Sequence, residues 1–376
     1  MEGLRRDVPL APLTTLGLGG PAEWLLEARE EAQVVEALRW ARARALPVSL
    51  LGGGSNLLVP DEGVRGLVLR LATRGVRSLD PGRRRVAAGE DWDRLVARCV
   101  AERLAGVECL AGIPGRVGAA PIQNIGAYGQ EVAETIAEVG VLDLATLQRH
   151  RLGPEQCGFG YRDSAFKRDP SRYLVLDVTF ALRPRGRPSV RYRELQQHVT
   201  EAASLAEVRQ TVLSLRRRKS MVLRADDPNR RSAGSFFVNP VVSPEHADAL
   251  VARAVREGIV SSGAKVPRWI VPGGVKLAAG WLIERAGFPK GTRRGNVGLS
   301  SAHALALVHH GGGTTAELLA FAEAIRRAVH ARFGVTLERE PRILTPVLTP
   351  DGGSSPPRPH AERHSPSQQR SSSTDP

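Results

Sequence analysis

The stretch from Gly112 to Gly129 restricts the possible folds of this chain more than any other feature. Five glycines interrupt mainly apolar residues over its eighteen positions, and no helical or strand period is visible. Glycine lets the backbone approach neighbouring groups closely, and an irregular loop this long must pack on something. The stretch therefore predicts an ordered loop packed either on the protein core or on a flat ligand.

A second glycine cluster, Gly52-Gly53-Gly54-Ser55-Asn56, directly follows a predicted strand at Pro47–Leu51. Consecutive glycines can turn several backbone N–H groups toward one point, and such a nest suits a pyrophosphate. The cluster matches neither the GxGxxG fingerprint nor a P-loop, and a plain glycine turn is the simpler alternative.

Periodic segments elsewhere predict a chain with both helices and strands. Further strands are expected at 66–71, 173–182 and 335–344. Helices are expected at 31–45, 91–104, 205–218, 244–257, 278–286 and 315–333, the last with Thr314 or Thr315 at its N-cap and Gly334 at its end. A length of 376 residues favours two or three domains. After about Pro350 almost nothing is apolar, which predicts a disordered tail over 350–376.

The net charge of +14 raises the question of nucleic-acid binding, but the basic residues are scattered and aromatic residues make up only 5%. No recognition motif accompanies them, so we expect no nucleic-acid partner. Attraction of small anionic substrates is the functional interpretation of the charge, and a compositional bias of the source is the simpler one.

The sequence also limits location and metal chemistry. No run of about 18 apolar residues exists and the N-terminus does not resemble a signal peptide, so we expect a cytoplasmic protein without membrane contact. Cys99, Cys109 and Cys157 form no CxxC pair and no cluster with histidine. Their spacing predicts inert thiols, with neither a disulfide framework nor a metal site.

Two short motifs carry residues suited to chemistry. Arg162, in the turn Phe159–Ser164, could hold a carboxylate through two hydrogen bonds, or could form a surface ion pair with Asp163 or Asp169. Ser235, in Gly234–Pro240, precedes two phenylalanines, so it could deliver a proton in a water-poor pocket or make an ordinary serine turn. Lysines near these motifs, at 219, 276 and 290, are candidate phosphate partners.

Taken together and in order, these motifs resemble the UDP-N-acetylenolpyruvoylglucosamine reductase family over residues 8–345. The resemblance is carried by Gly52–Asn56, Gly112–Gly129, Phe159–Ser164, Gly234–Pro240, Val275–Ile283 and Leu337–Arg342. It implies an α+β fold: a two-domain FAD-binding module of the vanillyl-alcohol-oxidase type plus a smaller α/β substrate-binding domain. The implied division is 1–72 with 334–348 returning to it, 73–205, and 206–333.

The resemblance also implies a reaction. Non-covalently bound FAD would be reduced by NADPH, and hydride would pass from flavin N5 to C3 of the enolpyruvyl group. Ser235 would protonate C2, while Arg162 and Glu340 would polarise the substrate carboxylate. A carboxyl group can help there only if it is protonated or hydrogen-bonded. The partners would be the nucleotide sugar and NADPH, and we expect a monomer.

Carried over residue by residue, the resemblance assigns two sets of contacts. Cofactor contacts are Gly52, Gly53, Gly54, Ser55, Asn56, Gly112, Ile113, Pro114, Gly118, Ala119, Gln123, Asn124, Gly126, Ala127 and Arg162. Substrate contacts are Tyr161, Tyr192, Lys219, Asn239, Lys290 and His303. Tyr192 is similar to the mobile-loop tyrosine of one family subtype. Val238 and His303 depart from the Lys and Gln more usual there.

Two other functions remain open at this point. A related flavin oxidase acting on a sugar or alcohol would share the FAD-binding loops, although such enzymes often attach FAD through a His or Cys and no His lies in Gly112–Gly129. A non-enzymatic nucleic-acid binder would rest on the charge alone.

Overall fold

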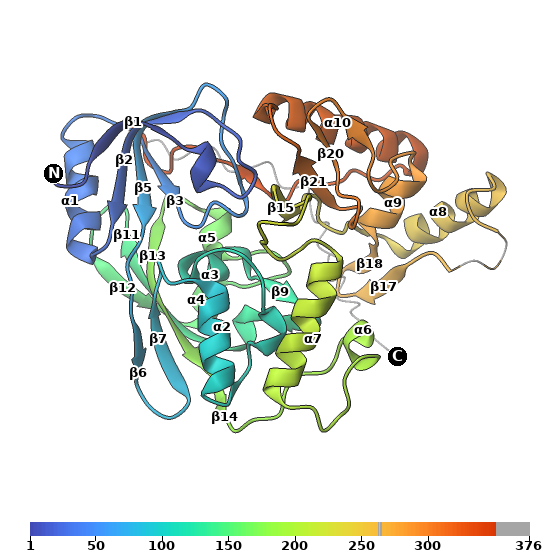
Figure 1. The fold of residues 1–376 in the computed structure, drawn as a ribbon, viewed down its shortest axis with the longest axis horizontal. Coiled ribbons are helices and arrows are strands. Elements are labelled where there is room, and N and C mark those ends of the chain that lie inside the picture. Colours follow the sequence, from blue (N-terminus) through green and yellow to red (C-terminus); the bar gives the residue numbers. More distant parts are fainter. Residues whose placement is uncertain (262, 264, 351–376) are drawn as a thin grey trace, which may run out of the picture.

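The computed structural model describes residues 1–261, 263 and 265–350. It contains three regions, each built on β-sheet, and we call the place where they meet, near the two glycine loops, the junction (Figure 1). The predicted disordered tail lies, from residue 351 onward, outside the described residues. The first sheet has the order β1-β2-β5-β3, with β2 and β3 parallel to β5 and β1 antiparallel to β2. Its members are β1 (Arg5–Pro9), β2 (Pro21–Ala28), β3 (Val48–Leu51) and β5 (Val64–Leu71). Helix α1 (Glu31–Arg42) buries Val34, Ala37, Leu38 and Ala41 against it.

The second sheet is fully antiparallel, in the order β12-β11-β13-β7-β6. Its members are β6 (Val76–Ser78), β7 (Arg83–Ala87), β11 (Ile136–Asp143), β12 (Arg149–Leu152) and β13 (Tyr173–Ala181). Helix α2 (Trp92–Ala101), N-capped by Asp91, packs on this region. Helix α7 (Leu205–Arg218) shares the same core and contacts α2, although the sequence division places it at the start of the third domain.

The third region combines an antiparallel sheet β15-β21-β20-β19 with a small sheet β16-β18-β17. Helices α9 and α10 bury apolar faces on these strands. Gly334 ends α10 in the left-handed conformation, and Thr314 caps its start, as predicted. The elements are β15 (Ser232–Ser235), β16 (Val241–Val242), α8 (Pro244–Arg256), β17 (Arg268–Val271), β18 (Gly274–Leu277), α9 (Ala279–Arg285), β19 (Arg293–Arg294), β20 (Val297–Leu299), β21 (Ala306–His309) and α10 (Thr315–Phe333).

Short elements connect these regions and shape the loops near the junction. They are β4 (Leu57–Leu58), β8 (Leu104–Ala105), α3 (Ala120–Gln123), β9 (Gly126–Ala127), β10 (Gln130–Glu131), α4 (Pro154–Cys157), α5 (Ala165–Arg168), β14 (Arg183–Pro184) and α6 (Arg193–Gln196). Four 3₁₀ turns join them, at Ala11–Leu13, Glu108–Leu110, Val117–Ala119 and Val132–Glu134.

The strand predicted over 335–344 is wrong for most of its length. Only β22 (Arg342–Ile343) is a strand, and it pairs in parallel with β4. Residues 338–340 instead bond to the backbone after β15, through Val238 N–H to Glu338 O and Glu340 N–H to Phe236 O. Pro341 then interrupts any ladder because it has no N–H. The segment thus runs from the third region back to the first.

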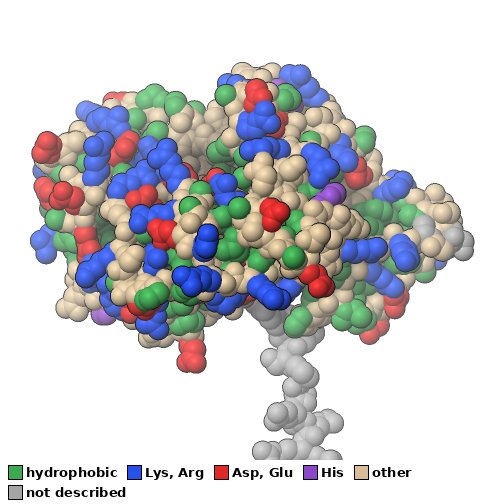
Figure 2. Space-filling model, turned by 60° about the horizontal axis from the view of Figure 1, so that its bottom comes forward, with side chains coloured by type: hydrophobic (Ala, Val, Ile, Leu, Met, Phe, Trp, Pro, Cys, Tyr) green, Lys and Arg blue, Asp and Glu red, His purple; other side chains and the backbone are tan. Residues whose placement is uncertain are grey.

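The three cysteines are buried, and the basic residues are scattered over the surface, as the sequence predicts. Cys99, Cys109 and Cys157 are buried and free, and burial raises the pKa of Cys99 and of Cys157 to about 12. On the face in Figure 2, Lys and Arg are spread widely and mixed with Asp and Glu. No helix of the described residues could cross a membrane.

Candidate active site

The two glycine loops lie against each other at the junction. A Cβ added at Gly53 would lie 2.8 Å from the Gly115 Cα, and one at Gly115 would lie 3.0 Å from the Ser55 hydroxyl. Ser55 Oγ donates to the Pro114 carbonyl at 3.0 Å, which ties the loops together. A Cβ at Gly52 would meet nothing within 4 Å, so this side of the loop is open. The two loops therefore form a narrow cradle with a free backbone edge.

A cavity of about 440 Å³ opens beside Gly53, between the first region and the chain that precedes β15. Four arginines line it: Arg70, Arg224, Arg230 and Arg231. Thr14 and Thr15 complete one wall, and Thr15 Oγ1 donates to the Ser232 carbonyl at 2.6 Å. A concentration of guanidinium groups beside an open glycine loop favours an anionic ligand there.

Arg162 is held in a strained turn that directs its side chain to the second glycine loop. Its φ is +53°, a left-handed conformation, and Gly160 and Asp163 exchange backbone hydrogen bonds around it. The guanidinium donates to the Gly126 carbonyl at 2.6 Å and to the Asn124 carbonyl at 3.3 Å. Asn124 is itself nearly buried and left-handed, with its amide donating to the Gly160 carbonyl.

Glu340 joins Arg162 from the opposite end of the sequence. Its Oε1 lies 3.9 Å from Arg162 Nε and accepts a hydrogen bond from Gln123 Nε2 at 2.9 Å. The side chains of Arg162 and Glu340 are largely shielded from solvent. Gln123 and Arg162 thus both face the same carboxyl oxygen of Glu340.

Ser235 ends β15 beside this pair. Its backbone pairs with Ala306, and the next residue, Phe236, bonds to both Leu305 and Glu340 through the main chain. Phe236 and Phe237 are fully buried. The main-chain bond between Phe236 and Glu340 therefore brings the backbone of Ser235 close to that of Glu340.

Tyr161, Asn239 and Lys276 form a rim that connects the junction to the third region. The Asn239 side chain hydrogen-bonds the Tyr161 hydroxyl, and its Oδ1 also accepts the first N–H of α9 at 3.0 Å. Lys276 Nζ lies 5.0 Å from the Tyr161 ring centre and 5.8 Å from that of Trp269. Sequence reasoning noted Lys276 only as a nearby lysine, and Trp269 carried no signal at all.

Tyr192 packs against the end of the second glycine loop, at Tyr128 and Gly129. Its ring meets Tyr128 edge-on at 5.6 Å, and Lys219 Nζ lies 5.7 Å from the Tyr128 ring centre. Lys219 also pairs with Glu194 at 2.6 Å. Tyr192 is 44% exposed, and the partial burial that remains raises its pKa.

His303 sits in the turn between β20 and β21, close to the strand of Ser235. Its Nδ1 accepts the Leu305 N–H at 3.0 Å. Burial, and then the positive charges of Lys219, Lys290 and Arg216, lower the pKa of His303 to about 4. The ring is therefore neutral near pH 7, with its proton on Nε2. Lys290 itself is exposed, at the edge of this group.

Arg216 is a site residue that sequence reasoning missed. It is only 8% exposed and donates to the carbonyls of Gly112 and Met221, at 3.3 and 2.8 Å. Its buried Nε has no hydrogen-bond partner in the described residues, and burial lowers its pKa to about 10. The signal was present: Val208, Val212 and Arg216 share one face of the predicted helix.

Among residues 1–261, 263 and 265–350, no group of three or more His, Cys, Asp or Glu side chains is placed to hold an ion.

Two models of known protein families match this chain, one in its N-terminal half and one in its C-terminal half. A family model for FAD-binding domains matches residues 22–150, and the model for the C-terminal domain of UDP-N-acetylenolpyruvoylglucosamine reductase matches residues 226–344. The fold and the matched models thus define an oxidoreductase built on a FAD-binding module, with a separate C-terminal domain.

Relatives of known name narrow this class. UDP-N-acetylenolpyruvoylglucosamine reductase of Thermobifida fusca is 47% identical over 356 residues, covering 91% of this chain and 98% of the relative. That of Streptomyces coelicolor is 46% identical, covering 89% and 88%. The crystal structure of the Thermus caldophilus enzyme covers 91% of this chain and all of its own, with 30% identity and a TM-score of 0.61. The chain belongs to the UDP-N-acetylenolpyruvoylglucosamine reductase family.

Proposed function

We propose that this protein uses NADPH to reduce UDP-N-acetylenolpyruvoylglucosamine to UDP-N-acetylmuramate, a step in the synthesis of peptidoglycan precursors. One observation carries the proposal. Arg162 and hydrogen-bonded Glu340, from segments 178 residues apart, meet beside Ser235 and the glycine cradle. Membership in this reductase family favours the reaction over that of a sugar oxidase.

The cradle fits FAD. The close approach of Gly53 and Gly115 and the open edge at Gly52 suit an extended pyrophosphate lying along the backbone. Residues of Gly52–Asn56 and Gly112–Gly118 would hold it, with Gln123, Asn124 and Gly126 near the reacting end. Bound FAD would supply hydride that originates from NADPH.

Arg162 offsets charge on the substrate. As the enolpyruvyl group is reduced, negative charge builds toward its carboxylate, and a fixed guanidinium stabilises that charge. Carbonyl contacts to Asn124 and Gly126 hold Arg162 in place before substrate arrives. Gln123 keeps Glu340 oriented, so that this carboxyl group can share a proton or hydrogen bond with the same carboxylate.

Ser235 delivers the proton to C2. The main-chain bonds of Phe236 to Leu305 and Glu340 fix the backbone that carries its hydroxyl. The next two residues, Phe236 and Phe237, are buried in the core of the third region and hold the chain beyond Ser235 in place.

The nucleotide half of the substrate would lie between Tyr192 on one side and the rim of Tyr161 and Asn239 on the other. Lys219 and Lys290 suit the phosphates, Tyr192 covers them, and Tyr161 and Asn239 form the opposite wall. The neutral His303 can donate from Nε2 to a uracil carbonyl, a role that a glutamine amide could fill equally. We further propose that the enzyme acts as a cytoplasmic monomer, with residues 1–72 plus 334–348 and 73–205 binding FAD and 206–333 binding substrate.

An anaerobic stopped-flow experiment at the flavin absorbance band tests the proposal. Enzyme reduced with NADPH is mixed with UDP-N-acetylenolpyruvoylglucosamine, and prompt reoxidation without oxygen is expected. Reduced flavin that ignores this substrate but reacts rapidly with oxygen would support an oxidase instead. Protein that carries no flavin and cannot be reconstituted with FAD would overturn both.

A further inference from the structure

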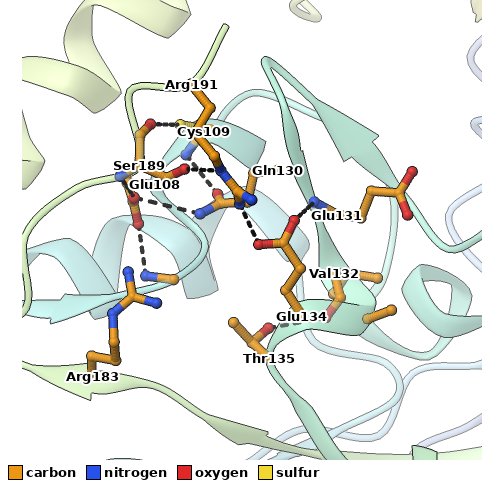
Figure 3. A network of polar contacts seen from close by, with 12 residues as sticks. Glu108, Cys109, Gln130, Glu131, Val132, Glu134, Thr135, Arg183, Ser189 and Arg191 are labelled. Atoms are coloured by element: carbon orange, nitrogen blue, oxygen red, sulfur yellow. Dashed lines mark hydrogen bonds and ion pairs between the residues drawn. The ribbon is translucent and has the colours of Figure 1, made fainter. Parts of the chain in front are cut away.

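We propose that Glu108 is a positioning residue that anchors the segment carrying Tyr192, and so sets the affinity for the nucleotide sugar. The proposal rests on the proposed function only in its second half, because the anchoring itself can be measured without any substrate. Figure 3 shows the network concerned, in which Glu108, Gln130, Ser189 and Arg191 point toward one another from three separate segments.

Glu108 is completely buried, yet all three of its hydrogen-bond donors are neutral. Its Oε2 accepts the Gly106 N–H at 2.7 Å, and its Oε1 accepts the Ser189 N–H at 2.7 Å and, more weakly, Gln130 Nε2 at 3.4 Å. A buried carboxylate is costly unless such bonds are made. The bond to Ser189 joins residues 81 positions apart and fastens a stretch of chain that has no regular secondary structure.

The attached stretch lies outside the helices and strands, with Val190 packed on the core of the second region. Strand β14 ends at Pro184 and helix α6 begins at Arg193, and residues 186–191 have no regular structure. A cavity of about 310 Å³ lies along this stretch, lined by Gly106, Gln130, Glu134, Thr135, Arg183, Ser189 and Arg191. With space on one side, hydrogen bonds rather than close packing hold Ser189 in place.

A second tie reinforces the first. Gln130 is nearly buried, and its Oε1 accepts the Cys109 N–H at 3.0 Å. The Cys109 thiol donates to the Ser189 carbonyl at 3.0 Å. Both main-chain groups of Ser189 are therefore bound to neighbouring residues 108 and 109, which leaves its peptide little rotational freedom.

The anchor is transmitted to Tyr192 over three residues. Arg191 Nε donates to the Ser189 hydroxyl at 2.9 Å, and its guanidinium pairs with Glu134. A Cβ placed on Gly129 would lie 3.5 Å from Tyr192 N, so the glycine loop packs directly on the Tyr192 backbone. Tyr128, on the same loop, meets the Tyr192 ring. Fixing Ser189 thus fixes Tyr192 relative to the cradle.

Substitution of Glu108 by Gln tests the hydrogen bonds of the anchor with little change in side-chain volume. A glutamine fills the same volume but offers only one acceptor oxygen, so one of the two N–H groups must face an NH₂ group and lose its bond. Asp177→Asn is the matched control, because Asp177 is also a buried carboxylate of the same region but pairs with Arg85, Arg149 and Arg151 on the sheet.

The substrate-free measurement is hydrogen–deuterium exchange of the whole enzyme below the melting temperatures of all variants. Glu108→Gln should speed exchange at least tenfold in peptides covering 186–192, with other peptides unchanged, whereas Asp177→Asn should leave 186–192 unchanged. A glutamine that turns its carbonyl oxygen toward Ser189 would keep that bond, so Glu108→Ala, which removes the acceptors of both N–H groups, is measured as well. Equal exchange in 186–192 for wild type, Glu108→Gln and Glu108→Ala would overturn the anchor, whatever reaction the enzyme performs.

The kinetic measurement tests the link to Tyr192. Glu108→Gln should raise KM for UDP-N-acetylenolpyruvoylglucosamine about tenfold while kcat falls less than threefold, and in a Tyr192→Phe background it should have little further effect. Additive effects of the two substitutions would overturn positioning through Tyr192. If wild type shows no reductase activity, the proposed function fails, while the exchange result still decides the anchor.

Discussion

The two sides of the candidate site are built in different ways. The cradle formed by residues 52–56 and 112–118 presents backbone, and its contacts depend on the absence of side chains at Gly53 and Gly115. The opposite side presents charged and polar side chains, including Arg162, Ser235 and Glu340. The first kind of surface suits a ligand that always stays in place, and the second suits charge that develops during a reaction.

This difference predicts different failures. A side chain added to the cradle acts through sterics and should prevent loading of the cofactor. A side chain removed from the reactive side should leave loading intact and slow one chemical step. The following variants test this contrast, from the largest expected effect to the smallest.

Gly53→Val should abolish flavin loading. Its Cβ would lie within about 3 Å of the Gly115 backbone, which cannot yield as a flexible side chain could. We expect the ratio of flavin to protein, measured by absorbance after purification, to fall at least tenfold. Gly153→Ala, at a site with nothing closer than 3.9 Å, is the control.

Gly52→Ala sharpens the same test, because its Cβ meets no protein atom within 4 Å. Weaker flavin binding with unchanged thermal stability of the flavin-free protein would point to direct contact with the ligand. Full loading in both Gly52→Ala and Gly53→Val would refute a backbone cradle.

Ser235→Ala should separate the two half-reactions. Reduction of the flavin by NADPH should survive, while turnover of the enolpyruvyl substrate should fall by about 10²-fold or more, because only the second half-reaction uses the proton. Single-turnover traces of each half-reaction measure this directly. Equal losses in both would contradict a proton-donor role.

His303→Gln should change how stability depends on pH. Because the pKa of His303 is about 4 in the folded protein and 6.5 in the unfolded chain, the unfolded chain binds more protons between these values. Wild type should therefore lose stability as pH falls from 6.5 to 4, by at most about 3 kcal/mol from this group. Thermal unfolding at pH 7 and pH 4.5 should show a smaller loss for His303→Gln. Parallel curves would mean that His303 does not titrate this way.

Lys276→Gln should have the smallest effect, a three- to tenfold rise (an order-of-magnitude expectation) in KM for the nucleotide sugar with kcat largely kept. Its ammonium lies near the rings of Tyr161 and Trp269 at the rim, away from the reacting carbon in our proposal. Steady-state kinetics would measure the change. Lys265→Gln removes the same charge at an exposed position and should have the KM of wild type. If its KM rises as much as that of Lys276→Gln, the effect comes from the net charge of the protein and not from the position of Lys276.

The contrast between the two sides also explains what could be predicted from the sequence. Helices α7 and α10 have the predicted bounds, since an apolar face and a cap are local signals. The glycine loops could also be predicted from the sequence, because clustered glycines indicate places where the backbone comes close to other groups. The prediction of a strand at 335–344 was wrong because the hydrogen-bond partners of residues 338–340 are at 236–238. These partners are distant in sequence, so they depend on the tertiary structure.

Side-chain contacts on the reactive side were harder to anticipate. The hydrogen bond from Gln123 to Glu340 spans 217 residues, and the placement of Lys276 between Tyr161 and Trp269 depends on how two regions meet. Short motifs indicated Arg162 and Ser235 as candidates, and the resemblance to a family added Glu340 and a role for each of the three. It did not reveal Arg216 or Glu108, two buried residues with ionisable side chains.

The late position of Glu340 has a consequence for biosynthesis. While the protein is being made, the strands of the first region and the cradle loops leave the ribosome well before residues 340–344, which must then insert beside β4 and Phe236. A nascent chain can therefore assemble the glycine cradle long before it holds the carboxylate opposite Arg162. Chains released prematurely would carry the glycine loops without Glu340, so in the proposed mechanism the loops that hold the cofactor are made before the reactive pair is complete.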